Sequence, residues 1–351
     1  MASPPSALRR QRLRLYLRIL AYGALIGGVF GAFLAPAGTA AYTSALIGAA
    51  NALLIAGCIS GIETFVLREG ASMRLLARLP FVAVVALKTL AYGGIIAVLV
   101  VGTQFLVRML PLQDHAAPLE RNTNLVIIGF SLAMTAIFVT VLQVAALLGR
   151  RTFRDLVLGR YRRPRAERRF FLFVDVVGST AIAERLGPLQ AHRFLAAVFS
   201  ATAEPVAACR GEIYQYIGDE IVVTWTQAEG VADARPLRCF FLMEESLLQL
   251  KDQFRAEFSA EPGLRAALHL GEVIAGEVGE ARRAIVFHGD VMNTASRLEQ
   301  ATRELGVRFI ASADALQALG PQPEMEFKDL GALALRGRKE PIRASGVALR
   351  N

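Results

Sequence analysis

Four long apolar stretches in the first half of the chain constrain its fold more than any other feature. They lie near residues 17–36, 41–67, 81–107 and 124–148, and each is near or above the ~20 residues that a helix needs to cross a bilayer. The first stretch is too long and too rich in glycine for a cleaved signal peptide, and Arg18 lies at its start. Charged residues make up only 20% of the 351 residues, which excludes an ordinary soluble protein. The sequence therefore predicts an N-terminal all-α bundle of four transmembrane helices over residues 1–148.

The positive charge of the chain is concentrated beside these stretches. Residues 9–18, 68–78 and 150–169 carry +5, +2 and +7, although the whole chain has a net charge of only +9. Because basic loops stay on the cytoplasmic side of a membrane, we expect the N-terminus, the 68–78 loop and everything after residue 149 to be cytoplasmic. The 37–40 and 108–123 loops would face outward. This pattern predicts a multi-pass protein of the inner (plasma) membrane that contacts the lipid bilayer and binds no nucleic acid.

Two ionisable residues, Glu63 and Lys88, fall inside the predicted helices near their cytoplasmic ends. We interpret them as an ion pair, or Glu63 as the partner of Arg68, in preference to a ligand or proton-relay site. Glycines also recur here at four-residue spacing, which lets helices approach closely within the bundle or in a dimer. These glycines are Gly23, Gly27 and Gly31 in the first stretch and Gly57 and Gly61 in the second.

The cytoplasmic half alternates strand and helix signals after a basic segment. Residues 150–161 have a helical composition that Pro164 ends, so residues 149–168 are predicted to form a basic helical connector and residues 169–351 a separate domain. Its predicted elements are a buried strand at 170–176, a helix over 180–208 broken near Pro188, two strands within 212–225, a long amphipathic helix over 232–258, further strands, a helix from about 290 to 303, and a strand–helix–strand tail. This β-α-β-β-α-β order predicts a C-terminal α+β domain built on a ferredoxin-like palm.

The first motif with chemical content is FLFVDVVGST, residues 171–180. Asp175 closes the buried strand, and Gly178, Ser179 and Thr180 open the helix that follows. Backbone N–H groups at a helix start can bind phosphates, and a carboxylate beside them can hold a divalent metal ion. The alternative is that Asp175 only caps the helix while Gly178 makes the turn.

The second motif, YQYIGDEIVVTW at residues 214–225, places Asp219 at the tip of a hairpin next to the first strand. An aspartate in a turn is more often only a turn residue. Two acids brought together by neighbouring strands change that balance, because like charges gathered on one face need a cation. Metal ions held between two carboxylates are the recurring device for in-line phosphoryl displacement.

The third motif, FHGDVMNTASRLE at residues 287–299, carries Asn293 and Arg297 four residues apart on a predicted helix. Both side chains therefore project from one face. A guanidinium and an amide held rigidly together suit the charge that develops on a pentavalent phosphate. The alternative is a solvated helix face.

Taken together, the three motifs resemble the class III adenylate/guanylate cyclase catalytic domain over roughly residues 168–348. The resemblance implies a homodimer with sites shared between protomers, one protomer supplying Asp175 and Asp219 and the other Asn293 and Arg297. The implied roles are two Mg²⁺ or Mn²⁺ ions per site held at Asp175, Val176 and Asp219, phosphate binding at Val177, Gly178, Ser179, Thr180 and, by a looser match, Arg336, and transition-state contacts from Asn293 and Arg297.

The chain departs from this family where the purine base is read. Adenylyl enzymes place a lysine four residues before the second metal aspartate, and guanylyl enzymes place a glutamate there, whereas this chain has Gln215. The partner position, usually aspartate or threonine, is Val286. Because a glutamine amide can present a donor or an acceptor, the resemblance leaves the choice between ATP and GTP open.

We therefore expect a membrane-anchored class III cyclase that converts ATP to cyclic AMP and pyrophosphate, with a guanylate or dual-specificity cyclase as the alternative. A diguanylate cyclase fits less well, because residues 217–221, IGDEI, do not match its Gly-Gly-Asp/Glu-Glu-Phe turn. A catalytically silent nucleotide-binding receptor would explain the missing purine lysine but not the intact acids. A small transporter with a regulatory domain has only Glu63 and Lys88 in its favour.

Overall fold

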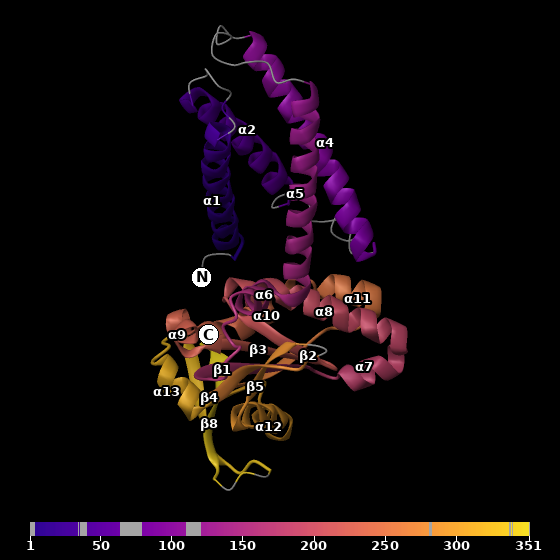
Figure 1. Ribbon diagram of the computed structural model, residues 1–351. Helices are drawn as coiled ribbons and strands as arrows, with labels where there is room; N and C mark the ends of the chain where they lie inside the picture. The colour runs from indigo at the N-terminus through magenta and orange to yellow at the C-terminus, as the bar shows by residue number, and fades with distance from the viewer. Residues whose placement is uncertain are drawn as a thin grey trace. The chain divides into compact units, whose positions relative to one another are not determined.

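The chain divides into two compact units, Met1–Arg150 and Arg151–Asn351, in a computed structural model (Figure 1). The structure describes residues 4–33, 35, 41–63, 79–109, 121–280, 283–336, 338 and 340–350. The 37–40 loop, the 68–78 loop with Arg68, and most of the 108–123 loop lie outside the described residues.

The first unit is all helical. Its long helices are α1 (Pro4–Phe33), α2 (Ala41–Gly61), α4 (Phe81–Met109) and α5 (Arg121–Leu148). Three apolar windows are long enough to cross a membrane, at Tyr16–Phe33, Ala41–Gly61 and Phe81–Thr103. The described part of α5 meets the same criterion only together with the helix after it. The described residues thus supply three or four candidate spans where the sequence predicts four.

Close packing of small residues joins α1 to α2. A Cβ atom at Gly27 would collide with Gly48 and Ala52 of α2, and one at Gly31 would collide with Ser44 and Gly48. The four-residue glycine spacing of α1 therefore serves packing within the bundle.

The predicted intramembrane ion pair is present. The Lys88 ammonium of α4 lies 2.7 Å from Glu63 Oε1, and the Tyr92 hydroxyl donates to the same oxygen at 2.7 Å. Since a charge in an apolar helix bundle needs a partner, this arrangement confirms the ion-pair interpretation.

The second unit is one mixed sheet covered by helices. In chain order its elements are α6 (Arg150–Val157), β1 (Arg165–Val176), α7 (Ser179–Leu186), α8 (Pro188–Ala208), β2 (Glu212–Ile217), β3 (Glu220–Thr226), α9 (Gln227–Val231), a 3-10 turn (Ala232–Ala234), α10 (Arg235–Gln249), α11 (Lys251–Phe258), β4 (Leu264–Val278), β5 (Ala284–His288), α12 (Asp290–Leu305), β6 (Phe309–Ser312), α13 (Ala313–Leu319), β7 (Met325–Leu333) and β8 (Ile342–Leu349). The sheet order is β2-β3-β1-β4-β6-β8-β7, with β5 paired to β4. The predicted β-α-β-β-α-β core is confirmed.

The central strand β1 is buried on both faces. Phe170 and Leu172 point into a core formed with α8, α10 and α11, whereas Phe171 and Phe173 pack on the other face with β5 and α12. This explains why the strand reads as a continuous apolar run. It also places α12 across the face opposite α8 and α10.

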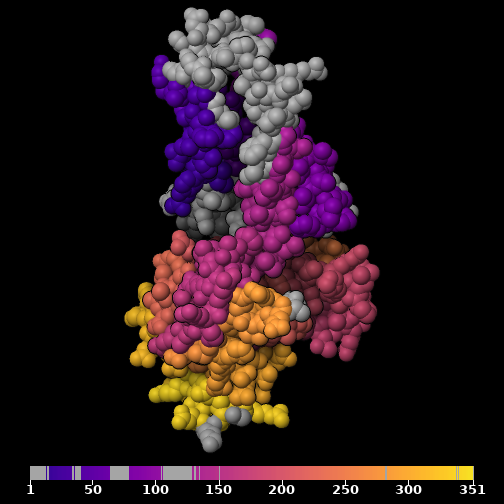
Figure 2. Space-filling model, in the orientation of Figure 1, coloured from indigo at the N-terminus to yellow at the C-terminus, as the bar shows by residue number. Residues whose placement is uncertain are grey.

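The connector belongs to the second unit. The Arg151 guanidinium of α6 lies 2.7 Å from Glu229 and 3.5 Å from Glu212. After α6, the N–H of Glu277 donates to the Tyr161 carbonyl at 2.9 Å, and Figure 2 shows this segment in magenta against the orange residues of β4 and β5. The start of the connector is thus attached to the sheet.

Three element boundaries differ from the sequence prediction. The connector helix ends at Val157, because Gly159 adopts a positive φ of 62°. Strand β1 begins five residues earlier than predicted, at Arg165, because the long strand β4 pairs with it from Ala275 onward. The tail contains one more strand than the predicted strand–helix–strand.

The predicted helix over 232–258 is wrong as a single element. It breaks at Leu250, which has φ −98° and ψ 6°, into α10 and α11. The break lets the Phe254 and Phe258 rings of α11 pack edge-on against Phe194 of α8, with ring centroids 5.6 and 5.5 Å apart. Tertiary packing of aromatic rings thus overrides a continuous helical pattern.

Candidate active site

The junction of β1 with α7 positions the first acid. Asp175 is the penultimate residue of β1 and is 2% exposed. Helix α7 begins after Gly178, which has φ 71° and ψ 16°, a left-handed conformation that favours glycine. The carboxylate of Asp175 bonds to neighbouring strands and helices and Gly178 occupies the cap position, so the helix-cap alternative for Asp175 does not hold.

The hairpin between β2 and β3 brings the second acid to the same place. Gly218 makes the turn with φ 62°, and Asp219 follows it. The Ser179 hydroxyl at the start of α7 donates to Asp219 Oδ2. The structure therefore joins the first two motifs. The Val177 N–H is already bonded to the Gly263 carbonyl at 2.9 Å, unlike the open amides that a phosphate-binding role would require.

Two arginines hold the Asp175 carboxylate. Arg265 Nη2 of β4 lies 2.7 Å from Asp175 Oδ2, and Arg303 Nη2 of α12 lies 3.0 Å from the same oxygen. Burial raises the pKa of Asp175, the Arg265 bond lowers it, and the charge of Asp219 raises it again, with a net upward shift. Sequence reasoning missed both arginines, because their proximity to Asp175 depends on strand register and helix packing.

Two further buried acids surround this pair. Burial raises the pKa of Glu220 to about 7, with further contributions from Glu299, Asp175 and Asp219. Burial, followed by the charge of Asp175, raises the pKa of Glu299. The buried Oε1 atoms of Glu220 and Glu299 have no hydrogen-bond partner among the described residues. Four carboxylates against two guanidinium groups leave an excess of negative charge.

This excess fits a divalent cation. In the part of the chain that the structure describes, no three His, Cys, Asp or Glu side chains converge closely enough to hold a metal ion alone. Mg²⁺ is usually bound by one or two carboxylates together with substrate phosphates and water. Asp175 and Asp219 provide two such carboxylates at one edge of the sheet.

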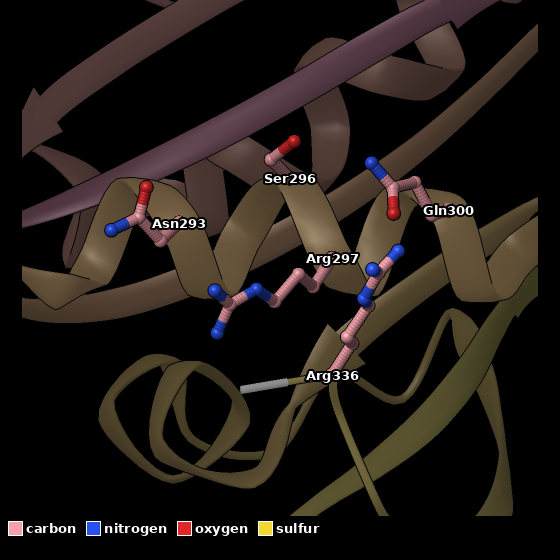
Figure 3. A pocket seen from close by; sticks show the side chains of 5 residues that line it. All are labelled: Asn293, Ser296, Arg297, Gln300 and Arg336. Atoms are coloured by element: carbon pink, nitrogen blue, oxygen red, sulfur yellow. The ribbon is translucent and has the colours of Figure 1, made fainter. Parts of the chain in front are cut away.

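A pocket of about 330 Å³ lies on a different face of α12 (Figure 3). Its helix residues are spaced at i, i+3, i+4 and i+7, which places them on one face. Figure 3 shows Arg336 reaching from the loop after β7 toward the helix, close to Arg297 and Gln300. The lining residues are Asn293, Ser296, Arg297, Gln300 and Arg336.

The third motif thus meets Arg336 but not the acids. Asn293, Arg297 and Arg336 share the pocket, whereas Asp175 and Asp219 do not line it. Within the described residues, neither Arg297 nor Arg336 forms a salt bridge, in contrast with Arg303 on the same helix. One helix therefore presents a charge-paired face to the acids and unpaired guanidinium groups to the pocket.

The residues expected to read the base lie on neighbouring strands. Gln215 is exposed on β2 and Val286 is half-buried on β5. The rings of Tyr214 and Phe287, one residue along from each, lie 5.0 Å apart between centroids. Strand β5 leads directly into α12, so this region adjoins the pocket helix.

The sheet, the acids at the end of its central strand and the arginine-bearing helix define a nucleotide-cyclase type of catalytic domain. The family described as adenylate and guanylate cyclase catalytic domain matches residues 164–344. That match covers just over half of the chain, which therefore belongs to this family.

The relatives and a solved structure agree with this membership. Adenylate cyclase 2 of Rhizobium meliloti (strain 1021) is 39% identical over 219 residues, which cover 62% of this chain and 60% of that protein. Adenylate cyclase 1 of the same organism is 30% identical over 176 residues, covering 49% and 26%. A bacterial light-regulated adenylyl cyclase structure shares the fold, with a TM-score of 0.51 at 22% identity over 62% of this chain and 64% of that one. The chain spans three fifths or less of the two Rhizobium proteins.

Proposed function

We propose that the protein is a membrane-anchored nucleotide cyclase that converts ATP to cyclic AMP and pyrophosphate. The observation that carries the proposal is the division of the site into an acidic half at Asp175 and Asp219 and a cationic half at Asn293, Arg297 and Arg336. Family membership and relatives named adenylate cyclases support it.

The acidic half would hold Mg²⁺ or Mn²⁺, two per site, through Asp175, Asp219 and the backbone of Val176. When bound, these ions would lower the pKa of the ribose 3′-hydroxyl and neutralise phosphate charge. The chain itself would contribute the amides of Gly178, Ser179 and Thr180 at the start of α7 as phosphate donors. Because the Val177 amide is occupied, we leave it out of this set.

The cationic half would act on the reacting phosphate. In the reaction, the 3′-oxygen forms a bond to the α-phosphorus while the bond to the pyrophosphate oxygen breaks. Arg297 would stabilise charge on the pentavalent phosphate, Asn293 would orient the ribose, and Arg336 would bind the phosphates. Unpaired guanidinium groups beside a pocket are suited to an anionic substrate.

The two halves would meet between protomers of a homodimer. Support comes from α12, where the pocket residues and the acid-contacting residues lie on different faces of one chain. Two inactive variants, Asp175→Ala and Arg297→Ala, test this when co-expressed with different tags. About half of randomly assorted dimers carry both chains, and each contains one intact site, so activity should recover to roughly a quarter of wild type. Tagged heterodimers without activity would contradict shared sites.

The direct test of the function is product analysis. Purified full-length protein is incubated with ATP or with GTP in the presence of Mn²⁺, and the products are separated. Cyclic AMP as the main product supports the proposal, and cyclic GMP would identify the guanylate alternative. Nucleotide binding without either product would favour a silent receptor, which the replacement of the purine lysine by Gln215 leaves open.

We also propose a location. The apolar windows of α1, α2 and α4 and the basic segments beside the predicted spans support a multi-pass protein of the inner membrane with a cytoplasmic catalytic domain. Protease protection of tags at residue 1 and in the 108–123 loop, measured in inside-out vesicles, tests this topology.

A further inference from the structure

The turn that carries Arg336 is attached to α12 at its apolar end. The N–H of Arg338 donates to the Leu335 carbonyl at 3.0 Å, which closes a four-residue turn with Arg336 at its second position. Leu335 is 8% exposed and belongs to the same apolar cluster as Leu298 and Ala301 of α12. The residue before Arg336 is therefore packed beneath the pocket helix.

The other end of the turn is attached by polar contacts. Arg338 Nη1 donates to Asp290 Oδ2 at 2.6 Å and to Thr294 Oγ1 at 2.6 Å. The Thr294 hydroxyl in turn donates to Asp290 Oδ2 at 3.3 Å, and Thr294 is fully buried. Charge-assisted bonds of this kind are stronger than neutral ones and set orientation as well as energy.

The polar attachment point lies beside the pocket. Thr294 directly follows Asn293, and Asp290 lies one helical turn before Thr294. Arg336 itself is exposed and has no salt bridge among the described residues. A long, unpaired side chain loses much conformational freedom when it binds a ligand, so a fixed backbone beneath it reduces that cost.

We propose that Arg338 is a positioning residue, which holds the Arg336 guanidinium in the pocket by fastening the 335–338 turn to Asp290 and Thr294 of α12. The inference rests on the proposed function, in which Arg336 binds nucleotide phosphates. Arg338 acts through Arg336 and does not contact the nucleotide.

A second ion pair on the same hairpin provides the control. Arg343 Nη2 of β8 lies 3.3 Å from Asp329 Oδ2 of β7, and both side chains are largely exposed. Arg343→Ala removes an arginine of the hairpin without touching the Asp290–Thr294 attachment. A general effect of hairpin charge would appear in this variant too.

The test is a double-mutant cycle in the full-length protein. Arg338→Ala, Arg336→Ala and the double variant are compared for kcat/KM with ATP and Mn²⁺, and for calorimetric binding of α,β-methylene-ATP, which cannot release pyrophosphate. We expect Arg338→Ala to lower kcat/KM about tenfold by misplacing Arg336, and to weaken analogue binding in parallel. In the Arg336→Ala background the same change should have no further effect. Arg338→Lys, which keeps a charge for Asp290, should restore part of the loss.

The outcomes separate the two levels of the argument. If Arg338→Ala costs the same factor with and without Arg336, or if it matches Arg343→Ala, the positioning role is overturned. If Arg336→Ala changes neither turnover nor analogue binding, the phosphate role proposed for Arg336 fails instead. Should Arg338→Ala not fold, Asp290→Asn in both backgrounds replaces it, because the variant removes the charge that Arg338 binds while keeping the shape of the side chain.

Discussion

The two charged regions that meet α12 differ in how their charge is balanced. The acidic region is buried, and its central carboxylate, Asp175, is already bonded to Arg265 and Arg303 of the same chain. The cationic region is open, and within the described residues Arg297 and Arg336 have no acidic partner. One half is thus partly neutralised from within, whereas the other presents its charge to whatever enters the pocket.

This difference indicates which half must change when a substrate arrives. An exposed guanidinium can bind a phosphate without losing an existing partner. A cation that approaches Asp175 must share that carboxylate with two arginines, although the crowded acids around it favour added positive charge. The cationic half is therefore preorganised, and the acidic half is adjustable.

The largest expected effect comes from removing either acid. Asp175→Ala or Asp219→Ala should reduce cyclic nucleotide formation at least about a thousandfold, because a two-carboxylate site keeps a single ligand. Asp252→Ala is the control, since the Asp252 side chain is 98% exposed on α11. Near-normal rates in either acid variant, at saturating Mn²⁺, would show that the acidic region is not the metal half.

Base recognition should depend on neither charged half. Gln215 offers one adaptable amide and Val286 offers none, so we expect ATP to be preferred over GTP by only about tenfold. Gln215→Glu should shift this preference toward GTP, because a carboxylate accepts from the guanine N1–H and 2-amino group. The measurement is kcat/KM for both nucleotides. Thousandfold selectivity in the wild type, or an unmoved ratio in the variant, would place base reading elsewhere.

Removing Arg303 sharpens the contrast between the halves. Arg303→Ala deletes one cation that competes for Asp175, so Mn²⁺ should bind about three- to fivefold more tightly without nucleotide, a modest change because Arg303 is half exposed. Electron paramagnetic resonance of free Mn²⁺ measures this. Arg255→Ala, which breaks an exposed ion pair on α11, is the control. Weaker Mn²⁺ binding would mean that Arg303 arranges Asp175 and does not compete for it.

The smallest effect concerns pH and stability. Burial raises the pKa of Glu220 to about 7, above the value of about 4.3 in an unfolded chain. Its contribution to stability is therefore fully present below pH 4.3 and is lost as the pH rises through 7. Glu220→Gln should raise the thermal midpoint in EDTA at pH 8 by about 2–4 °C, for a screened cost of about 1 kcal/mol, and by less at pH 5. Exposed Glu326→Gln is the control, and an equal gain at both pH values would contradict the assigned cause.

Much of the catalytic domain could be predicted because its signals are local. A buried apolar strand, a glycine–aspartate hairpin and an i, i+4 pair each depend on neighbouring residues, and the structure contains β1, the β2–β3 hairpin and α12 where they were expected. The shared pocket of Asn293, Arg297 and Arg336 also agrees with the family resemblance.

The parts that could not be predicted depend on contacts distant in sequence. Arg265 lies opposite Asp175 only once β1 and β4 pair in register, and Arg303 reaches Asp175 across 128 positions. The break at Leu250 and the occupied amide of Val177 likewise result from packing against other segments. Local patterns carry no record of these neighbours.

The two faces of α12 have a consequence for the proposed dimer. Each copy of the helix would hold Asp175 of its own chain through Arg303 while supplying Asn293 and Arg297 to the other site. Because a helix of 16 residues moves largely as one body, a small rotation that admits nucleotide at one site also changes the grip on the acid at the second. The two sites would then communicate without any additional regulatory domain, and substrate saturation would follow a Hill coefficient different from one.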